Sequence, residues 1–155
     1  MSDYESLQQS IAEIHEDPMN RELYLARGIQ WYECKCYDEC ASDLLFYEAL
    51  GGTDPLYMKC LGMALQMTTS KRATDYMKKY LSIDKDDIDA MAWLAETFYQ
   101  SGDYESSAIY YAKAVEKGYD PGIMRAKAAE LAGSKMYDEA ARFDLSFKKK
   151  SLFRR

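Results

Sequence analysis

Two kinds of turn signal recur in this chain at one spacing, and a fixed repeat length constrains the fold more than any other feature of the sequence. The first signal is a turn followed by a tyrosine and an acidic residue, and it occurs at Tyr37, Tyr104 and Tyr137. The first interval is 67 residues and the second is 33, so one copy with a weaker signal fits between Tyr37 and Tyr104. The segment that begins at Ser70 lies where that copy is expected.

The second signal is an aspartate followed by a proline, at Asp54-Pro55 and at Asp120-Pro121. These pairs lie 66 residues apart, which is again twice the repeat length. Aspartate caps the amino end of a helix, and proline is preset for the first helical position. The two signals therefore predict helices that begin at the same point of every second repeat.

Between these signals, apolar residues recur at intervals of three and four, which is the helical period. In the first repeat, Tyr24, Gly28 and Trp31 share one face of a predicted helix. The spacing predicts helices of about 12 to 14 residues joined by short turns. Helix pairs this short cannot bury their apolar faces alone and must stack on their neighbours, so the pattern favours a solenoid.

Two segments, residues 24–32 and 93–104, together with residues 110–114, resemble the tetratricopeptide repeat family. The resemblance extends over roughly residues 21–150 and implies an all-α, right-handed α-solenoid of about four helix pairs. The implied units are residues 21–54, 55–87, 88–120 and 121–150, with an N-terminal capping helix in residues 1–20 and a basic C-terminal tail in residues 151–155.

The resemblance assigns roles to particular residues and shows where the chain departs from the family. The small residues expected where two helices touch are Gly28, Gly62, Ala95 and Ala128. The departures are Arg27 and Lys127 where the family usually has leucine, and Ser107 where it usually has alanine.

The predicted N-terminal helix places Tyr4, Leu7, Ile11 and Ile14 on one face. We expect this face to cover the exposed apolar side of the first repeat, as terminal caps of solenoids do. The alternative is a homodimer contact through the same helix, although four apolar residues are too few for a stable coiled coil.

The chain has a net charge of −6, and its last eight residues, KKKSLFRR, supply five positive charges. Without these five charges the net charge is −11, so most of the protein is acidic and offers no surface for nucleic acid. The sequence contains neither a signal-peptide pattern nor a run of about 20 apolar residues that could span a membrane. The expected location is the cytoplasm.

The sequence offers little material for catalysis or for metal binding. It has one histidine, His15, and none of the common phosphate-binding, nucleophile or zinc-protease motifs. Cys34, Cys36 and Cys40 form a cluster that could gather soft-metal ligands or act in redox chemistry, but Cys40 lies where the repeat has a buried small residue. We therefore expect no enzyme activity and no cofactor, and a metal or redox role of this cluster is the alternative.

The resemblance implies that the first helix of each unit lines a concave groove that binds a protein or peptide partner. The expected groove residues are Leu25, Ile29, Tyr32, Lys59, Met63, Met67, Trp93, Glu96, Tyr99 and Arg125. Rings and methionines suit peptide binding, although each of these residues could equally belong to the core. The lysine and asparagine clamp of chaperone-binding family members is absent, because its places hold Leu25, Ile29 and Cys60.

The expected function is therefore that of a protein-binding adaptor or scaffold. A narrower alternative is a secretion chaperone similar to the small acidic tetratricopeptide chaperones of bacterial type III systems.

Overall fold

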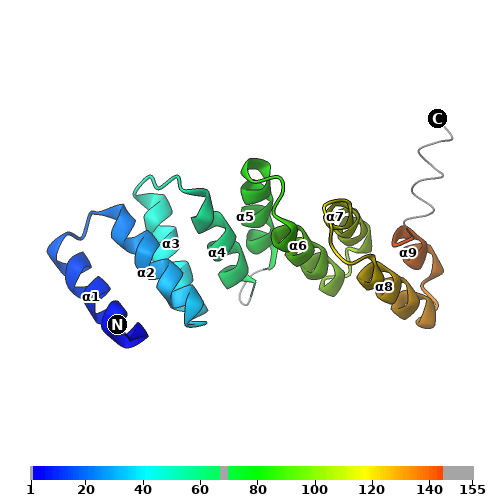
Figure 1. Ribbon diagram of the computed structural model, residues 1–155, viewed down its shortest axis with the longest axis horizontal. Coiled ribbons are helices and arrows are strands. Elements are labelled where there is room, and N and C mark those ends of the chain that lie inside the picture. Colours follow the sequence, from blue (N-terminus) through cyan, green and yellow to red (C-terminus); the bar gives the residue numbers. More distant parts are fainter. Residues whose placement is uncertain (1, 67–69, 145–155) are drawn as a thin grey trace. The chain divides into compact units, whose positions relative to one another are not determined.

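The computed structural model describes residues 2–66 and 70–144, and all regular secondary structure in these ranges is α-helical (Figure 1). The described helices form two compact units, one ending at Ile83 and the other beginning at Asp84. The predicted groove residue Met67 and the predicted basic tail, residues 151–155, lie outside the described residues.

The first unit contains five helices. They are α1 (Asp3–Glu16), α2 (Arg21–Glu33), α3 (Tyr37–Ala49), α4 (Pro55–Leu65) and α5 (Ser70–Ile83). The most extensive contacts join α2 to α3 and α4 to α5, and α3 also packs against α4 (Figure 1). Each pair consists of two helices that are consecutive in the chain, as the repeat length predicts.

The second unit contains α6 (Ile88–Gln100), α7 (Tyr104–Glu116), α8 (Pro121–Gly133) and α9 (Tyr137–Arg142). Here α6 pairs with α7 and α8 pairs with α9 (Figure 1). The α9 helix has six residues, whereas α7, which occupies the same place in the preceding pair, has 13. The last pair is therefore shorter than the other one in this unit.

Aspartates begin several of these helices, as the second turn signal predicts. The side chains of Asp54 and Asp120 each accept a hydrogen bond from a backbone N–H of the first turn, at 2.9 Å and 2.8 Å. Asp87 and Asp103 cap α6 and α7 in the same way. These caps satisfy N–H groups that have no partner within the helix.

In three of the described helix pairs, the turn between the helices passes through one residue with a positive φ angle. That residue is Gly102 in one pair, but it is Lys35 and Lys135 in the other two, with φ angles of 60° and 61°. Glycine adopts this conformation without steric cost, whereas a lysine there is strained by roughly 1 kcal/mol. The turns at the two lysines are therefore held by the packing of the helices on either side.

Three of the predicted small residues lie where a larger side chain would crowd the neighbouring helix. A Cβ atom added to Gly28 would lie 2.6 Å from a methyl carbon of Leu44, and Ala95 has no exposed surface. A Cβ atom on Gly62 would lie 3.1 Å from the backbone oxygen of Ala73. Ala128, in contrast, is only half-buried.

Ser107 shows how a departure from the family pattern is accommodated in the core. Its side chain is completely buried and donates a 2.7 Å hydrogen bond to the backbone oxygen of Ala95. A buried hydroxyl without a partner would cost about 1 to 3 kcal/mol, and this bond removes that cost. The α6 and α7 helices are thus joined by a buried polar contact.

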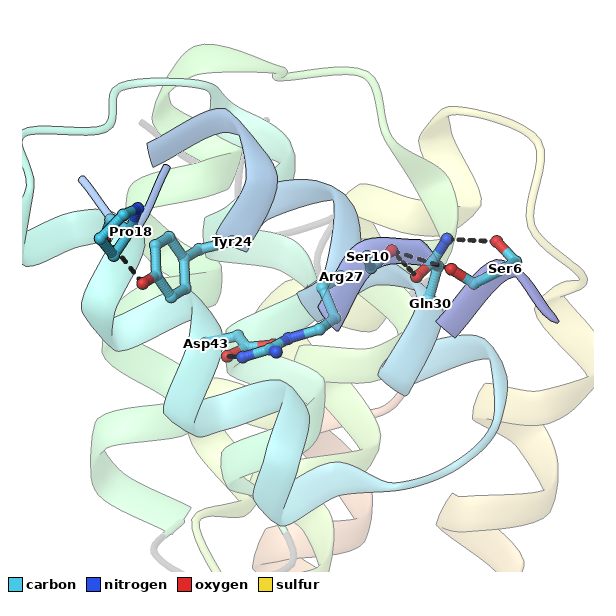
Figure 2. Close-up of polar contacts among 7 residues, drawn as sticks. All are labelled: Ser6, Ser10, Pro18, Tyr24, Arg27, Gln30 and Asp43. Atoms are coloured by element: carbon cyan, nitrogen blue, oxygen red, sulfur yellow. Dashed lines mark hydrogen bonds and ion pairs between the residues drawn. The ribbon is translucent and has the colours of Figure 1, made fainter. Parts of the chain in front are cut away.

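The prediction that an apolar face of α1 covers the first repeat is wrong for two of its four residues. Tyr4 and Ile11 are 71% and 45% exposed, while Leu7 and Ile14 are half-buried. The contact with α2 is polar instead: Ser10 donates to the side-chain oxygen of Gln30 at 2.8 Å, and the Gln30 amide donates to Ser6 at 2.6 Å (Figure 2). These bonds turn the serine side of α1 toward α2, which leaves part of the apolar stripe in solvent.

We expect Ala95→Leu to lower the free energy of unfolding by about 1 to 3 kcal/mol, because the longer side chain has no space where α6 meets α7. The measurement is the urea midpoint of the variant against that of the unaltered protein. Ala126→Leu is the matched control, since Ala126 is exposed on α8. Equal midpoints for both variants would contradict the packing described here.

Candidate functional site

In the first unit, four of the predicted groove residues lie on two helices, α2 and α4. They are Ile29, Tyr32, Lys59 and Met63, all half-buried, and we call them the α2/α4 face. The Tyr32 hydroxyl lies 2.8 Å from the Met63 sulfur and donates a hydrogen bond to it. This contact brings together two side chains that are 31 residues apart in the sequence.

The electrostatics of the α2/α4 face are those of a mostly apolar surface. Burial raises the pKa of Tyr32, so its hydroxyl stays protonated at neutral pH. The Lys59 ammonium lies 5.6 Å from the centre of the Tyr80 ring, a distance at which a cation is attracted to the ring. The face therefore presents an aliphatic side chain, a neutral phenol and a thioether, with one cation at its edge.

Leu25, a predicted groove residue on α2, belongs to the core instead. It is 8% exposed, and it therefore has almost no surface left for a partner. Cys60, which holds one of the places of the absent clamp, is also buried. Leucine at this position faces inward because it packs within the first unit, a possibility that the sequence alone left open.

In the second unit, Trp93, Glu96 and Tyr99 are half-buried on α6. Glu96 is the centre of a polar network: the Lys127 ammonium lies 3.0 Å from one carboxylate oxygen and 3.2 Å from the other, and the Tyr111 hydroxyl donates to the same side chain. Burial alone would raise the pKa of Glu96, but the hydrogen bonds from Tyr111 and Lys127 outweigh it and lower this pKa. Glu96 is therefore ionised and fixed in position.

A lysine, Lys127, stands where the family usually has leucine, and its contacts account for the charged side chain. Its ammonium lies over the Tyr99 ring, 4.0 Å from the ring centre, in addition to its ion pair with Glu96. Burial, followed by the nearby charge of Glu130, raises the pKa of Tyr99 to about 12. The sequence identified Glu96 and Tyr99 but missed Lys127, although its appearance in place of leucine was a signal.

Arg125, the last predicted groove residue, lies at a different place, on the wall of a cavity of about 580 Å³ between α8 and α9. The other lining residues are mainly small and apolar: Pro121, Met124, Ala128, Ala129, Ala132, Ala140, Ala141, Phe143 and Asp144. The structure therefore separates Arg125 from the α6 residues with which the sequence grouped it. We call this space the α8/α9 cavity.

Arg27 pairs with Asp43, a partnership that the sequence did not predict. Two guanidinium nitrogens of Arg27 lie 2.7 Å and 2.8 Å from the two carboxylate oxygens of Asp43 (Figure 2). The side chains are only 19% and 8% exposed, respectively. The hydrogen bonds to Asp43 raise the pKa of Arg27, although burial opposes the effect. This two-pronged pair links α2 to α3 beside the close contact at Gly28.

The cysteines are not arranged as a shared site. Cys34 is exposed, Cys36 is half-buried, and Cys40 and Cys60 are buried as free thiols. Burial raises the pKa of Cys40 to about 12 and that of Cys60 to about 11, so both remain protonated and unreactive at neutral pH. In the part of the chain that the structure describes, no three His, Cys, Asp or Glu side chains lie close enough to share a metal ion.

This arrangement of paired helices is the tetratricopeptide repeat fold, and solved structures show it directly. YrrB, described as a TPR protein with an unusual peptide-binding site, has 14% sequence identity and a TM-score of 0.76, over 91% of this chain and 74% of its own. A TPR repeat-containing protein from Cytophaga hutchinsonii has 16% identity and a TM-score of 0.71, over 91% of this chain and 57% of its own.

The structure of MamA is also similar, with 19% identity and a TM-score of 0.72 over 88% of this chain and 81% of its own. No protein-family model matches the sequence, and no curated protein matches it. The comparisons thus confirm the fold that the repeat pattern predicted. Among the described helices, none is both long and apolar enough to cross a membrane.

We expect Glu96→Gln to lower the free energy of unfolding by about 1 kcal/mol at neutral pH, because the amide loses the ion pair with Lys127 at a partly exposed site. A lowered folded-state pKa stabilises the fold above the unfolded pKa, 4.5 for glutamate. This contribution is lost as the pH falls through the folded-state pKa. Urea titrations at about pH 7 and about pH 3 should therefore show a smaller pH dependence in the variant.

Glu116→Gln is the control for that experiment, because Glu116 is exposed on α7. Its pH dependence should match that of the unaltered protein. Identical pH profiles for Glu96→Gln and Glu116→Gln would contradict the role assigned to Glu96.

We expect Asp43→Asn to destabilise the first unit by about 3 to 5 kcal/mol, because it leaves the Arg27 charge buried without its partner. The double change Arg27→Met with Asp43→Leu should cost much less, since it removes both charges and keeps the volume. Urea unfolding of the two variants provides the comparison. A double variant less stable than Asp43→Asn would show that the pair itself stabilises the fold.

Proposed function

We propose that this chain is a non-catalytic protein-binding module and that the α2/α4 face takes an apolar segment of a partner protein. The observation that supports this proposal most is the hydrogen bond from the Tyr32 hydroxyl to the Met63 sulfur, which joins two half-buried side chains of α2 and α4 within the first unit.

The chemistry of this face favours binding over catalysis. A tyrosine ring offers a large contact area with few rotatable bonds, and a methionine side chain adapts to differently shaped partners. Neither Tyr32, with its raised pKa, nor the two flanking side chains supplies a base or a nucleophile at neutral pH. The peptide-binding site named for YrrB, a protein of the same fold, is consistent with this proposal.

The partner segment is one with two apolar side chains close together and basic residues beside them. Ile29 and Met63 each provide half-buried apolar surface, which a pair of neighbouring apolar side chains would cover. In the described residues of the first unit, 13 acidic side chains stand against eight basic ones. This balance attracts positive flanks and repels negative ones.

The second unit offers an additional contact area around Trp93 on α6. Trp93 is half-buried, and its neighbours Glu96 and Tyr99 are fixed by Lys127. A fixed carboxylate beside an aromatic ring suits a basic or aromatic side chain of a partner. We propose that this area binds part of the partner independently of the α2/α4 face.

We expect Ile29→Ser to weaken peptide binding at least about tenfold, because it removes apolar contact area from the α2/α4 face. A displayed library of random peptides of about 15 residues is first panned on the protein. The affinity of an enriched peptide is then measured for each variant by calorimetry. Enriched sequences should contain paired apolar residues with basic flanks.

Ile83→Ser is the matched control, because Ile83 is 55% exposed at the end of α5 in the same unit. It should leave the peptide affinity within about twofold. Urea midpoints of both variants verify that the unit remains folded. Failure to enrich any apolar peptide, or equal losses of affinity in both variants, would refute the proposed site.

A further inference from the structure

The outer side of α5 concentrates positive charge in a unit that is otherwise acidic. Four of the eight Lys and Arg side chains in the described part of the first unit lie on this helix, at Lys71, Arg72, Lys78 and Lys79, and all four are exposed. Of the 13 acidic side chains in the same residues, only Asp75 lies on α5. We call these five residues the α5 basic face.

The helical period divides the cations of the α5 basic face into two pairs. Lys71 and Arg72 lie seven residues before Lys78 and Lys79, which is two turns or about 10.5 Å along the axis. Asp75 lies about one turn from each pair and reduces the repulsion between them. The other side of the helix is buried in the first unit, at Ala73, Tyr76, Met77 and Tyr80.

The stability of α5 itself does not account for the first pair of cations. Lys71 and Arg72 lie in the first turn of the helix, where the positive end of the helix dipole disfavours cations. The first turns of α1, α2 and α3 contain acidic residues instead. Two cations at this end of α5 therefore weaken the helix, which favours a role for them outside it.

One buried tyrosine holds a cation of each pair in position. Tyr76 is 8% exposed, and its hydroxyl donates a 3.0 Å hydrogen bond to Glu48 and accepts one from Arg72. The Lys79 ammonium lies 5.3 Å from the centre of the same ring, a distance at which a cation is attracted to it. Long side chains that are already ordered lose less entropy when a partner binds them. The face is therefore preorganised for anionic groups.

We propose that the α5 basic face binds an acidic helical segment of a partner protein. The segment carries two pairs of carboxylates seven residues apart, because that spacing places them opposite the two cation pairs. A basic residue lies midway between the carboxylate pairs, where it meets Asp75. This inference concerns a surface other than the α2/α4 face and does not rest on the peptide binding proposed for that face.

A narrow partner suits this face better than a broad anionic surface such as a lipid bilayer. In residues 2–66 of the same unit, twelve acidic side chains stand against four basic ones. A bilayer of anionic lipids would repel this surface while it approached α5. A single helix is only about 10 Å wide, so it can contact α5 alone.

Fluorescence anisotropy with a labelled peptide and the full chain tests this binding. The probe is an alanine-based helix of about 20 residues with two glutamate pairs seven residues apart and one lysine midway. The control peptide has the same composition, but its four glutamates are spread around the helix. We expect the probe to bind at least about tenfold more tightly than the control peptide, and to bind more weakly at about 200 mM salt than at about 20 mM.

Variants of the chain locate the binding surface. Lys71→Gln combined with Lys78→Gln should weaken binding of the probe at least about fivefold, because it removes one cation from each pair and leaves the contacts of Tyr76 in place. Lys113→Gln combined with Lys135→Gln is the matched control, since it removes the same charge at exposed positions of the second unit. The control should change the affinity less than about twofold, and circular dichroism verifies that both variants are folded.

Equal affinities for the two peptides, or equal losses in the α5 variant and its control, would overturn the proposal. It would also be overturned, in favour of a membrane contact, by a chain that ignores the probe but binds phosphatidylserine vesicles through Lys71 and Lys78. Ile29→Ser should leave the affinity for the probe within about twofold, because it alters only the α2/α4 face. The outcome at α5 is therefore distinguishable from the outcome at that face.

Discussion

The close approach of two helices at a small residue is the constraint on which the rest of the structure depends. At Gly28 there is no room for a single additional carbon beside Leu44, and at Ala95 the side chain is completely buried. Such contacts let short helices bury enough surface to be stable as pairs. The orientation of the solvent-facing side chains follows, because fixing one face of a helix inward fixes the opposite face outward.

The sequence was informative about features that repeat and much less so about features that occur once. The spacing of Tyr37, Tyr104 and Tyr137 predicted the helix pairs, since a local turn signal acts on its own neighbours. The sequence left open whether Leu25 lies in the groove or in the core, because a residue near the border of a helix face can pack either way, and the structure buries it. The prediction for the apolar face of α1 was wrong at Tyr4 and Ile11 for a related reason. Hydrogen bonds to Gln30, which is remote in sequence, decide which side of α1 faces α2.

Three departures from the family pattern become intelligible when their partners are known. Arg27 pairs with Asp43, Lys127 with Glu96, and Ser107 with the backbone of Ala95. Each replaces an apolar contact with a polar one at a position that remains buried or nearly so, and each partner lies on another helix. A single sequence shows the unusual residue but not its partner, so the candidate site in the second unit was found only in part.

Polar contacts of this kind decide how the helices pack, and under the proposed function they would also affect which partners can be bound. A buried ion pair contributes little to stability compared with apolar residues of the same volume, but it penalises any arrangement that separates its charges. With Lys127 held between Glu96 and the Tyr99 ring, the surface of α6 near Trp93 presents a carboxylate whose charge is partly neutralised. A partner that approaches this surface meets a ring and a fixed dipole rather than a mobile anion, which favours selection by shape over attraction by charge alone.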